Sequence, residues 1–277
     1  MRLAFAPAVA LLALGCSAEI DSYTADAESG STHALVSVER TEVLEGGERA
    51  QALATFMHLP ADADARGVME SVGIAVALPN VGQCVRDNEP SGAYRGSVEL
   101  ISAGDVQLST TDSTVGLAPH AFPTVTDVVS GLVYATRDQA AEPFPTGTNY
   151  TFKVDGELGA FSVTRPAPDA LTAITVGGVP LSEAGALSAS APMDLTWSVG
   201  SPGDVLWVEV ASAGGSTITC AFRDDLGAAT LNADLLHGGT ARLSLHRLRR
   251  AEFQAPGLAR GEIRFDFAVS ASVTFTP

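Results

Sequence analysis

The residues of this 277-residue chain that could do chemistry include three cysteines, five histidines and two tryptophans. The histidines stand singly, at His33, His58, His120, His237 and His246. The sequence contains no local motif of a zinc site, a calcium loop, a nucleophile elbow or a phosphate-binding loop. We therefore predict no catalytic residue, no metal and no cofactor. Distant loops can still assemble a catalytic triad, so a hydrolase that uses one histidine with an acid such as Asp224 remains an alternative.

Two of the cysteines, Cys84 and Cys220, form a candidate disulfide. They follow an apparent export signal, and disulfides persist outside the cytoplasm. The bridge would close a loop of more than a hundred residues, worth about 4 to 5 kcal/mol in the chain-entropy model. However, Cys220 shares the apolar face of one strand with Ile218 and Phe222, which also fits a buried free thiol. We favour the disulfide.

Trp207 lies on the polar side of a predicted strand. Leu206, Val208 and Val210 share the apolar face, so Trp207 and Glu209 point the other way. An outward tryptophan could stack on a sugar ring or fill a partner's pocket, since tryptophan is enriched in interface hot spots. We favour the alternative that a neighbouring loop or domain covers it, and we keep ligand stacking at Trp207 as a candidate.

The sequence Asp224-Asp225-Leu226-Gly227 could supply carboxylates to calcium, which takes six to eight oxygen ligands. Two acids before a glycine are more typical of a hairpin turn. We predict the turn.

A basic cluster stands out from the acidic background of the chain. It consists of Arg242, His246, Arg247, Arg249 and Arg250. The cluster could meet an acidic glycan or a lipid headgroup. The next strand carries Glu262, Arg264 and Asp266 on one face, however, so a hairpin across residues 257–261 would set opposite charges against each other. We favour this structural role.

The N-terminus has the layout of a secretory signal. Arg2 precedes an apolar run over residues 3–14, which is too short for a membrane-spanning helix of about 20 residues. The run ends in Ala13-Leu14-Gly15-Cys16, which is similar to the lipobox of bacterial lipoproteins, although leucine is usual where Ala13 stands. We predict a signal peptide over residues 1–15 and lipidation of Cys16; the alternative is an ordinary cleaved signal. Several acyl chains, palmitate among them, would anchor the protein stably in a membrane.

Charge excludes one class of partner. The chain has 16 basic and 32 acidic residues, and removal of Arg2 with the signal leaves a net charge of −17. Nucleic-acid binding needs clustered cations that neutralise phosphates. We therefore expect no nucleic-acid partner.

The elements that must position these residues are predicted to be strands. Residues 16–33 are acidic and rich in small residues, which is typical of a flexible tether after the lipidated Cys16. From residue 34 on, apolar residues recur at every second position and are separated by turn residues. Val72, Ile74, Val76 and Leu78 predict one such strand. A short helix over residues 48–57 is a local alternative.

The pattern is interrupted at Thr164–Ala170, where two prolines cannot donate to a β-ladder. We place a domain boundary here and predict an all-β fold of two antiparallel, immunoglobulin-like β-sandwich domains, over residues 34–165 and 166–277. Seven short strands after the boundary suit such a sandwich. The sequence Gly147-Thr148-Asn149-Tyr150 is similar to the tyrosine corner of these folds.

The body also resembles a family of cell-envelope lipoproteins of myxobacterial-type deltaproteobacteria. The resemblance covers most of the mature chain and rests on four stretches: SAGDVQLS; VVSGLVYATRD with PFPTGTNYTFKVDG; MDLTWSVGSPGDVLWVEV; and TITCAFRDDLGAATL. It implies an immunoglobulin-like body facing the periplasm or the cell surface and assigns no catalytic residue.

These observations favour a non-catalytic structural or protein-binding module of the bacterial cell envelope. We expect it to be lipid-anchored at the outer membrane, because Ser17 stands where an aspartate would favour retention at the inner membrane. The expected partners are the membrane, through the anchor, and an envelope protein or a glycan. A carbohydrate-binding surface lipoprotein is the first alternative, because fold alone does not select a function.

Overall fold

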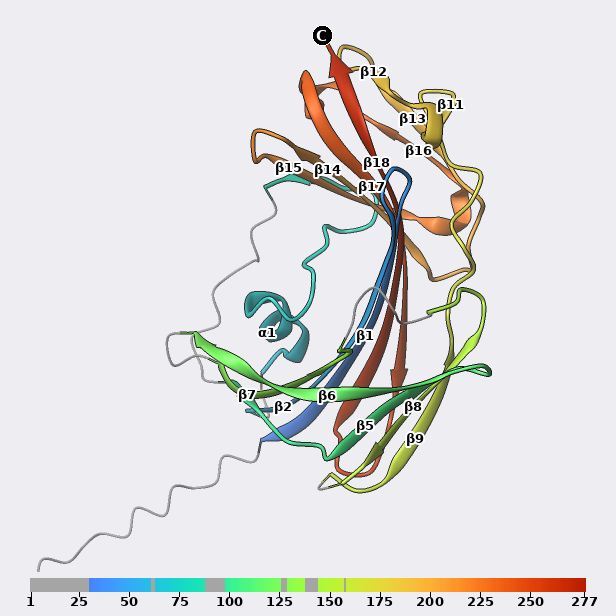
Figure 1. The fold of residues 1–277 in the computed structure, drawn as a ribbon. Helices are drawn as coiled ribbons and strands as arrows, with labels where there is room; N and C mark the ends of the chain where they lie inside the picture. The colour runs from blue at the N-terminus through green and yellow to red at the C-terminus, as the bar shows by residue number, and fades with distance from the viewer. Residues whose placement is uncertain (1–29, 61–62, 88–97, 126–128, 138–143, 157) are drawn as a thin grey trace, which may run out of the picture.

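The computed structural model describes residues 30–60, 63–87, 98–125, 129–137, 144–156 and 158–277 (Figure 1). The elements of the first half are β1 (Ser31–Val43), β2 (Gly47–Leu59), α1 (Ala65–Ser71), β3 (Cys84–Arg86), β4 (Val98–Leu100), β5 (Asp105–Ser109), β6 (Thr114–Val125), β7 (Val129–Ala135), β8 (Asn149–Asp155) and β9 (Phe161–Pro166). Those of the second half are β10 (Thr175–Val176), β11 (Val179–Pro180), η1 (Leu181–Glu183), β12 (Ala186–Ser188), β13 (Met193–Thr196), β14 (Val205–Ser212), β15 (Thr217–Arg223), η2 (Asp224–Leu226), β16 (Ala228–Leu231), η3 (Ala233–Leu235), β17 (Gly239–Phe253) and β18 (Arg260–Thr276).

The strands form one large sheet and one small sheet. The large sheet runs β3-β15-β14-β17-β18-β1-β2-β4-β7-β6-β5-β8-β9, and β12 also pairs with β18. The small sheet runs β11-β10-β13-β16. The all-β sandwich prediction is confirmed. Not every pairing is antiparallel, because β1 and β12 run parallel to β18, and β4 runs parallel to β7.

Strands β17 and β18 form a long hairpin that runs through both halves of the molecule (Figure 1). Alternate side chains of β18 face inward along its whole length. Phe265 and Phe267 enter a lower core with β1, β2, β5 and β8, whereas Val273 and Phe275 enter an upper core with β13, β14 and β15. One hairpin therefore supplies a wall to both sandwiches.

The lower core contains the tyrosine corner that the sequence indicates. Tyr150 is fully buried, and its hydroxyl donates a 2.8 Å hydrogen bond to the carbonyl oxygen of Pro145, five residues upstream. Burial raises the pKa of this phenol well above its usual range. The hydroxyl thus fixes the chain that enters β8.

The two halves of the chain exchange segments across residues 165 and 166, where we placed the domain boundary. Strand β3 pairs with β15, and the lower part of β17 and β18 belongs to the core of the first half. Two hydrophobic cores exist on either side of that position, but they share strands.

Three local predictions differ from the structure. Strand β1 begins at Ser31, inside the predicted tether, because the backbone of residues 31–33 pairs with β2 although its side chains are polar. Residues 48–57 lie in β2, and the helix of this region is α1. Residues 72–78 are not a strand: Val72 caps α1, and the rest is irregular chain.

Helix α1 and the chain after it cover the outer face of the large sheet, which is the face turned away from the two main cores. Val68 and Met69 of α1 pack on Leu35 of β1 and Met57 of β2 in a third, smaller core. The chain then runs from the helix to β3 (Figure 1). We call residues 73–78 the roof segment.

Candidate functional site

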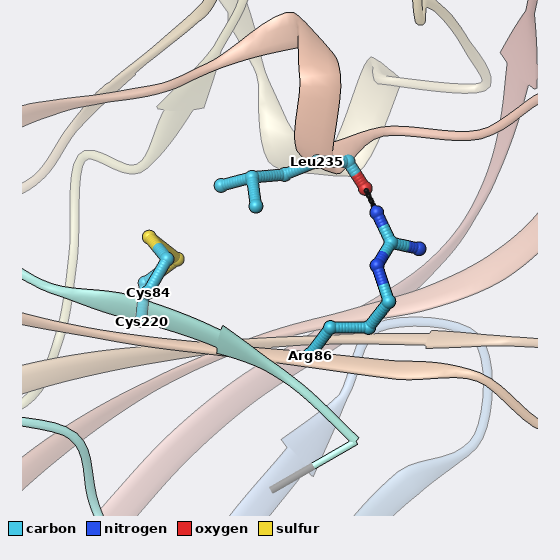
Figure 2. Close-up of a disulfide and its surroundings, with 4 residues drawn as sticks. All are labelled: Cys84, Arg86, Cys220 and Leu235. Carbon is cyan, nitrogen blue, oxygen red and sulfur yellow. Dashed lines mark hydrogen bonds between the residues drawn. A yellow bond between two sulfur atoms is a disulfide. The ribbon is translucent and has the colours of Figure 1, made fainter.

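The disulfide between Cys84 and Cys220 is present and joins β3 to β15 (Figure 2). The two cysteines face each other directly in the antiparallel register, so both sulfurs lie on the same side of the sheet. Cys220 is also completely buried in the upper core. The disulfide and the burial of Cys220 are both confirmed, whereas the alternative of a free thiol is wrong, because the bridge itself is part of the core.

Neighbouring contacts hold β3 on the second half of the chain as well. Arg86 donates a 3.0 Å hydrogen bond to the carbonyl oxygen of Leu235 in η3 (Figure 2). The Thr217 amide donates to the Asp87 carboxylate at 2.8 Å. The disulfide and these bonds fix one end of the connection that contains the roof segment.

Asp224 lies in a tight turn, as predicted, but the turn does not close a hairpin, because β15 belongs to the large sheet and β16 to the small one. Its carboxylate pairs with Arg247. Residues 224–226 form η2, and Gly227 follows with φ of 65°. The side chains of Asp224 and Arg247 are 0% and 1% exposed, and Arg247 Nε lies 2.6 Å from Asp224 Oδ2. Burial raises the pKa of Asp224, and Arg247 opposes that rise. A Cβ at Gly200 would fall 1.8 Å from Asp224 Oδ2, so only glycine fits beside the pair.

Arg247 also ties down the proline-rich segment between the two halves. Its guanidinium donates to the carbonyl oxygens of Asp169 and Ala170, each at 3.1 Å, and to that of Ser198. Arg249 donates to the carbonyl oxygen of Ala167 and pairs with Asp204. These arginines satisfy backbone oxygens of the predicted boundary.

The basic cluster is therefore split between the two faces of β17. Arg247 and Arg249 face inward, whereas His246 and Arg250 lie on the outer face. The hairpin is confirmed, but its register is not the one expected, because Arg250 lies directly opposite Arg264. Basic and acidic side chains meet diagonally instead, as in the 2.8 Å contact between His246 Nδ1 and Asp266 Oδ1.

Trp207 points to the outer face, as predicted, and is covered. It is 5% exposed, and its ring stacks on that of His246 with centroids 3.6 Å apart. The roof segment faces Trp207 across the cavity that both of them line. The favoured interpretation of a covering loop thus describes this side chain, and one ring face that a sugar would use is taken by His246.

The cavity beside Trp207 is the candidate functional site. It has a volume of about 280 Å³ and lies between the outer face of the large sheet and the roof segment. Apolar side chains from both layers form most of its wall. They are Leu35, Leu53, Ile74, Val76, Leu78, Trp207 and Leu248. Ligand sites are typically concave and largely apolar with a few placed polar groups, and this volume is at the small end of their range.

Four charged side chains also line the cavity: Glu39, Arg250, Arg264 and Asp266. Three of them have partners within the chain. Glu39 accepts hydrogen bonds from Ser37 and Gln51, Asp266 contacts His246, and Arg264 pairs with Glu262.

Arg250 is the exception. Its Nε atom is buried and lacks a hydrogen-bond partner, and within the described ranges no carboxylate forms an ion pair with its guanidinium. Burial, together with the nearby Arg264 and Arg66, lowers the pKa of Arg250 to about 10. The Nε1 atom of Trp207 is likewise buried without a partner. Buried donors of this kind cost free energy unless they are satisfied.

The structure does not assemble the hydrolase alternative around Asp224, whose carboxylate pairs with Arg247. His246 with Asp266 resembles the base of a triad, but in the part of the chain described here no serine, threonine or cysteine bonds to His246. Among the same residues, no group of histidine, cysteine and acidic side chains could hold a metal ion.

The N-terminal predictions lie outside the described residues. These are the signal over residues 1–15, the lipidated Cys16 and the tether as far as residue 29. In the ranges that are described, no helix has the length and apolarity needed to cross a membrane.

The roof segment is what sequence reasoning missed. Its alternation of apolar residues predicts a strand, whereas the chain is irregular: Ile74 and Leu78 are half-buried, and Val76 is 52% exposed. Gly73 with φ of 74° directly after α1, and Pro79 at the end of the alternation, were the available signals against a strand.

Comparison with known proteins gives no family. No family model and no curated protein sequence matches the chain. The solved structures that match include the FN1-FN3 domains of chicken CNTN1, at 11% identity and a TM-score of 0.20. The match covers 82% of this chain and 63% of that one, so this chain spans less than two thirds of the matched structure. A TM-score this low supports no conclusion about topology or activity.

Proposed function

We propose that this protein is a lipid-anchored, non-catalytic binding module of the bacterial cell envelope, and that the cavity beside Trp207 is its binding site. The observation that carries the binding role is the cavity itself, which is largely apolar, roofed, and lined by a partly buried arginine that has no counter-ion among the described residues. The lipobox-like ending at Cys16 and the resemblance to envelope lipoproteins support the anchor.

The arrangement of the site favours a small ligand over a polysaccharide. Sugar stacking needs an accessible aromatic face, and Trp207 is almost fully buried against His246. A roofed cavity instead encloses its ligand and removes both the ligand and the wall from water.

The anchor is tested by labelling cells of the native host with a palmitate analogue. We expect the wild-type protein to be labelled and to sediment with the outer membrane, and Cys16→Ala to be unlabelled and absent from the membrane, since two or more acyl chains are needed for stable anchoring. Ser17→Ala, next to the acceptor, is the control and should still be labelled. The anchor would be contradicted if the wild type and Cys16→Ala both lacked the label and sedimented with the membrane in equal amounts.

The binding role is tested separately, by filling the cavity and measuring the ligand content of the purified protein. Ser37 lies on the cavity floor, so Ser37→Phe places an aromatic ring in the space that a ligand would take.

A further inference from the structure

We infer that the cavity beside Trp207 selects a small organic anion, with a carboxylate held by the Arg250 guanidinium and an apolar body against Trp207 and the roof segment. This inference rests on the proposed binding function and adds the chemical class of the ligand.

Contacts among the described residues leave one cation of the cavity wall, Arg250, without a direct partner, while the carboxylates of Glu39 and Asp266 line the same wall. Glu39 and Asp266 accept hydrogen bonds from neighbouring side chains, and Arg264 is held by Glu262. Arg66 on α1, whose charge also acts on Arg250, is occupied by Glu70 at 3.1 Å. In the described part of the chain Arg250 alone of the lining charges has no partner, so an incoming anion meets a cation that is free to bind it.

Arginine suits a carboxylate in particular. Its planar guanidinium presents donors in a fork that matches two carboxylate oxygens. Because the side chain is partly buried, the ion pair forms away from bulk water, where charge-assisted hydrogen bonds are stronger than at an exposed site.

The rest of the wall sets the requirement for an apolar body. Leu53 and Leu248 from the sheet and Ile74 and Leu78 from the roof segment surround the space beside Trp207. An anion without an apolar part would leave this surface wet, whereas an alkyl or aromatic group would displace that water. The ligand class is therefore amphipathic rather than a free inorganic anion.

The test is isothermal titration of the full mature protein, disulfide intact, with octanoate, octanamide and acetate. Octanamide keeps the chain and loses the charge; acetate keeps the charge and loses the chain. We expect octanoate to bind at least about ten-fold more tightly than either. The margin over octanamide corresponds to about one charge-assisted hydrogen bond, and the margin over acetate comes from burial of the alkyl chain.

Arg250→Gln should abolish the preference for octanoate over octanamide, and Arg250→Lys, which keeps the charge, should retain part of it. Arg242→Gln is the matched control, because Arg242 is an exposed arginine on the same face of β17. Thermal unfolding of each variant verifies that it is folded.

Equal binding of octanoate and octanamide, unchanged by Arg250→Gln, would overturn the anion inference and leave the proposed binding function standing. Binding of none of the three probes would also overturn it. A different experiment tests the proposed binding function itself. That function fails if the protein purified from its own host's membranes carries no bound molecule.

Discussion

Replacement of Arg247 by methionine should lower the free energy of unfolding by at least about 3 kcal/mol. The change leaves the Asp224 carboxylate buried without its counter-ion, and breaking one side of a buried pair typically costs about 3 to 5 kcal/mol. It also leaves the carbonyl oxygens of Asp169, Ala170 and Ser198 without their donor. The measurement is urea unfolding at neutral pH with the disulfide intact.

Two variants make this result specific. Arg242→Met, an exposed change on the same strand, should alter stability by less than about 0.5 kcal/mol. The double variant Arg247→Met with Asp224→Asn removes both charges and should be more stable than Arg247→Met alone by at least about 1 kcal/mol, since neighbouring sites couple. A cost below about 1 kcal/mol for Arg247→Met, or strictly additive costs in the double variant, would refute the role of the pair.

Removal of the disulfide should have the largest effect on stability of any change considered. The cysteines are 136 positions apart in the sequence, and the chain-entropy model assigns a loop of that size about 5 kcal/mol. The double variant Cys84→Ala with Cys220→Ala should lose most of this amount in urea unfolding. Hydrogen exchange should also show loss of protection at Gly82, whose amide bonds to the Ala221 carbonyl oxygen.

The same variant should weaken ligand binding, because the disulfide fixes one end of the connection that carries the roof segment. Arg86→Ala removes the hydrogen bond to Leu235 while keeping the bridge, so it should produce a much smaller loss of stability. An unchanged unfolding midpoint without the disulfide would show that β3 is held by other contacts.

Much of the strand pattern could be predicted, because half-buried strands alternate apolar and polar residues. The shared apolar face of Leu206, Val208 and Val210 lies in β14, and that of Ile218, Cys220 and Phe222 lies in β15. Alternation also fitted residues 72–78, which are irregular: a chain that lies on a sheet can bury some of its apolar side chains without pairing its backbone.

The sharing of the hairpin between two cores could not be read from alternation. The inward face of β18 is equally apolar from Ile263 to Phe275, so nothing in the pattern marks the point where one core ends and the other begins. The pairing of β1 with β18 joins residues more than 200 positions apart and runs parallel, which a local pattern does not specify.

Part of the candidate site could be predicted from the sequence. The strand pattern placed Trp207 on the outer face correctly, and the inward parity of Arg247 with Leu243 and Leu245 could have shown that this arginine is buried and must be paired. Whether Arg250 has a partner depends on which acidic side chains pair with the neighbouring basic ones. That pairing follows from the register of the β17–β18 hairpin, and the register differs from the one predicted.

The most direct test of the binding role is native mass spectrometry of the protein purified from its own host's membranes. The proposal predicts a bound organic molecule of defined mass in the wild type and in Ser37→Ala, and its loss in Ser37→Phe, whose ring fills the cavity. Wild-type protein that carries no bound molecule, or a bound molecule that Ser37→Phe retains in equal amount, would contradict the assignment of this cavity as the binding site.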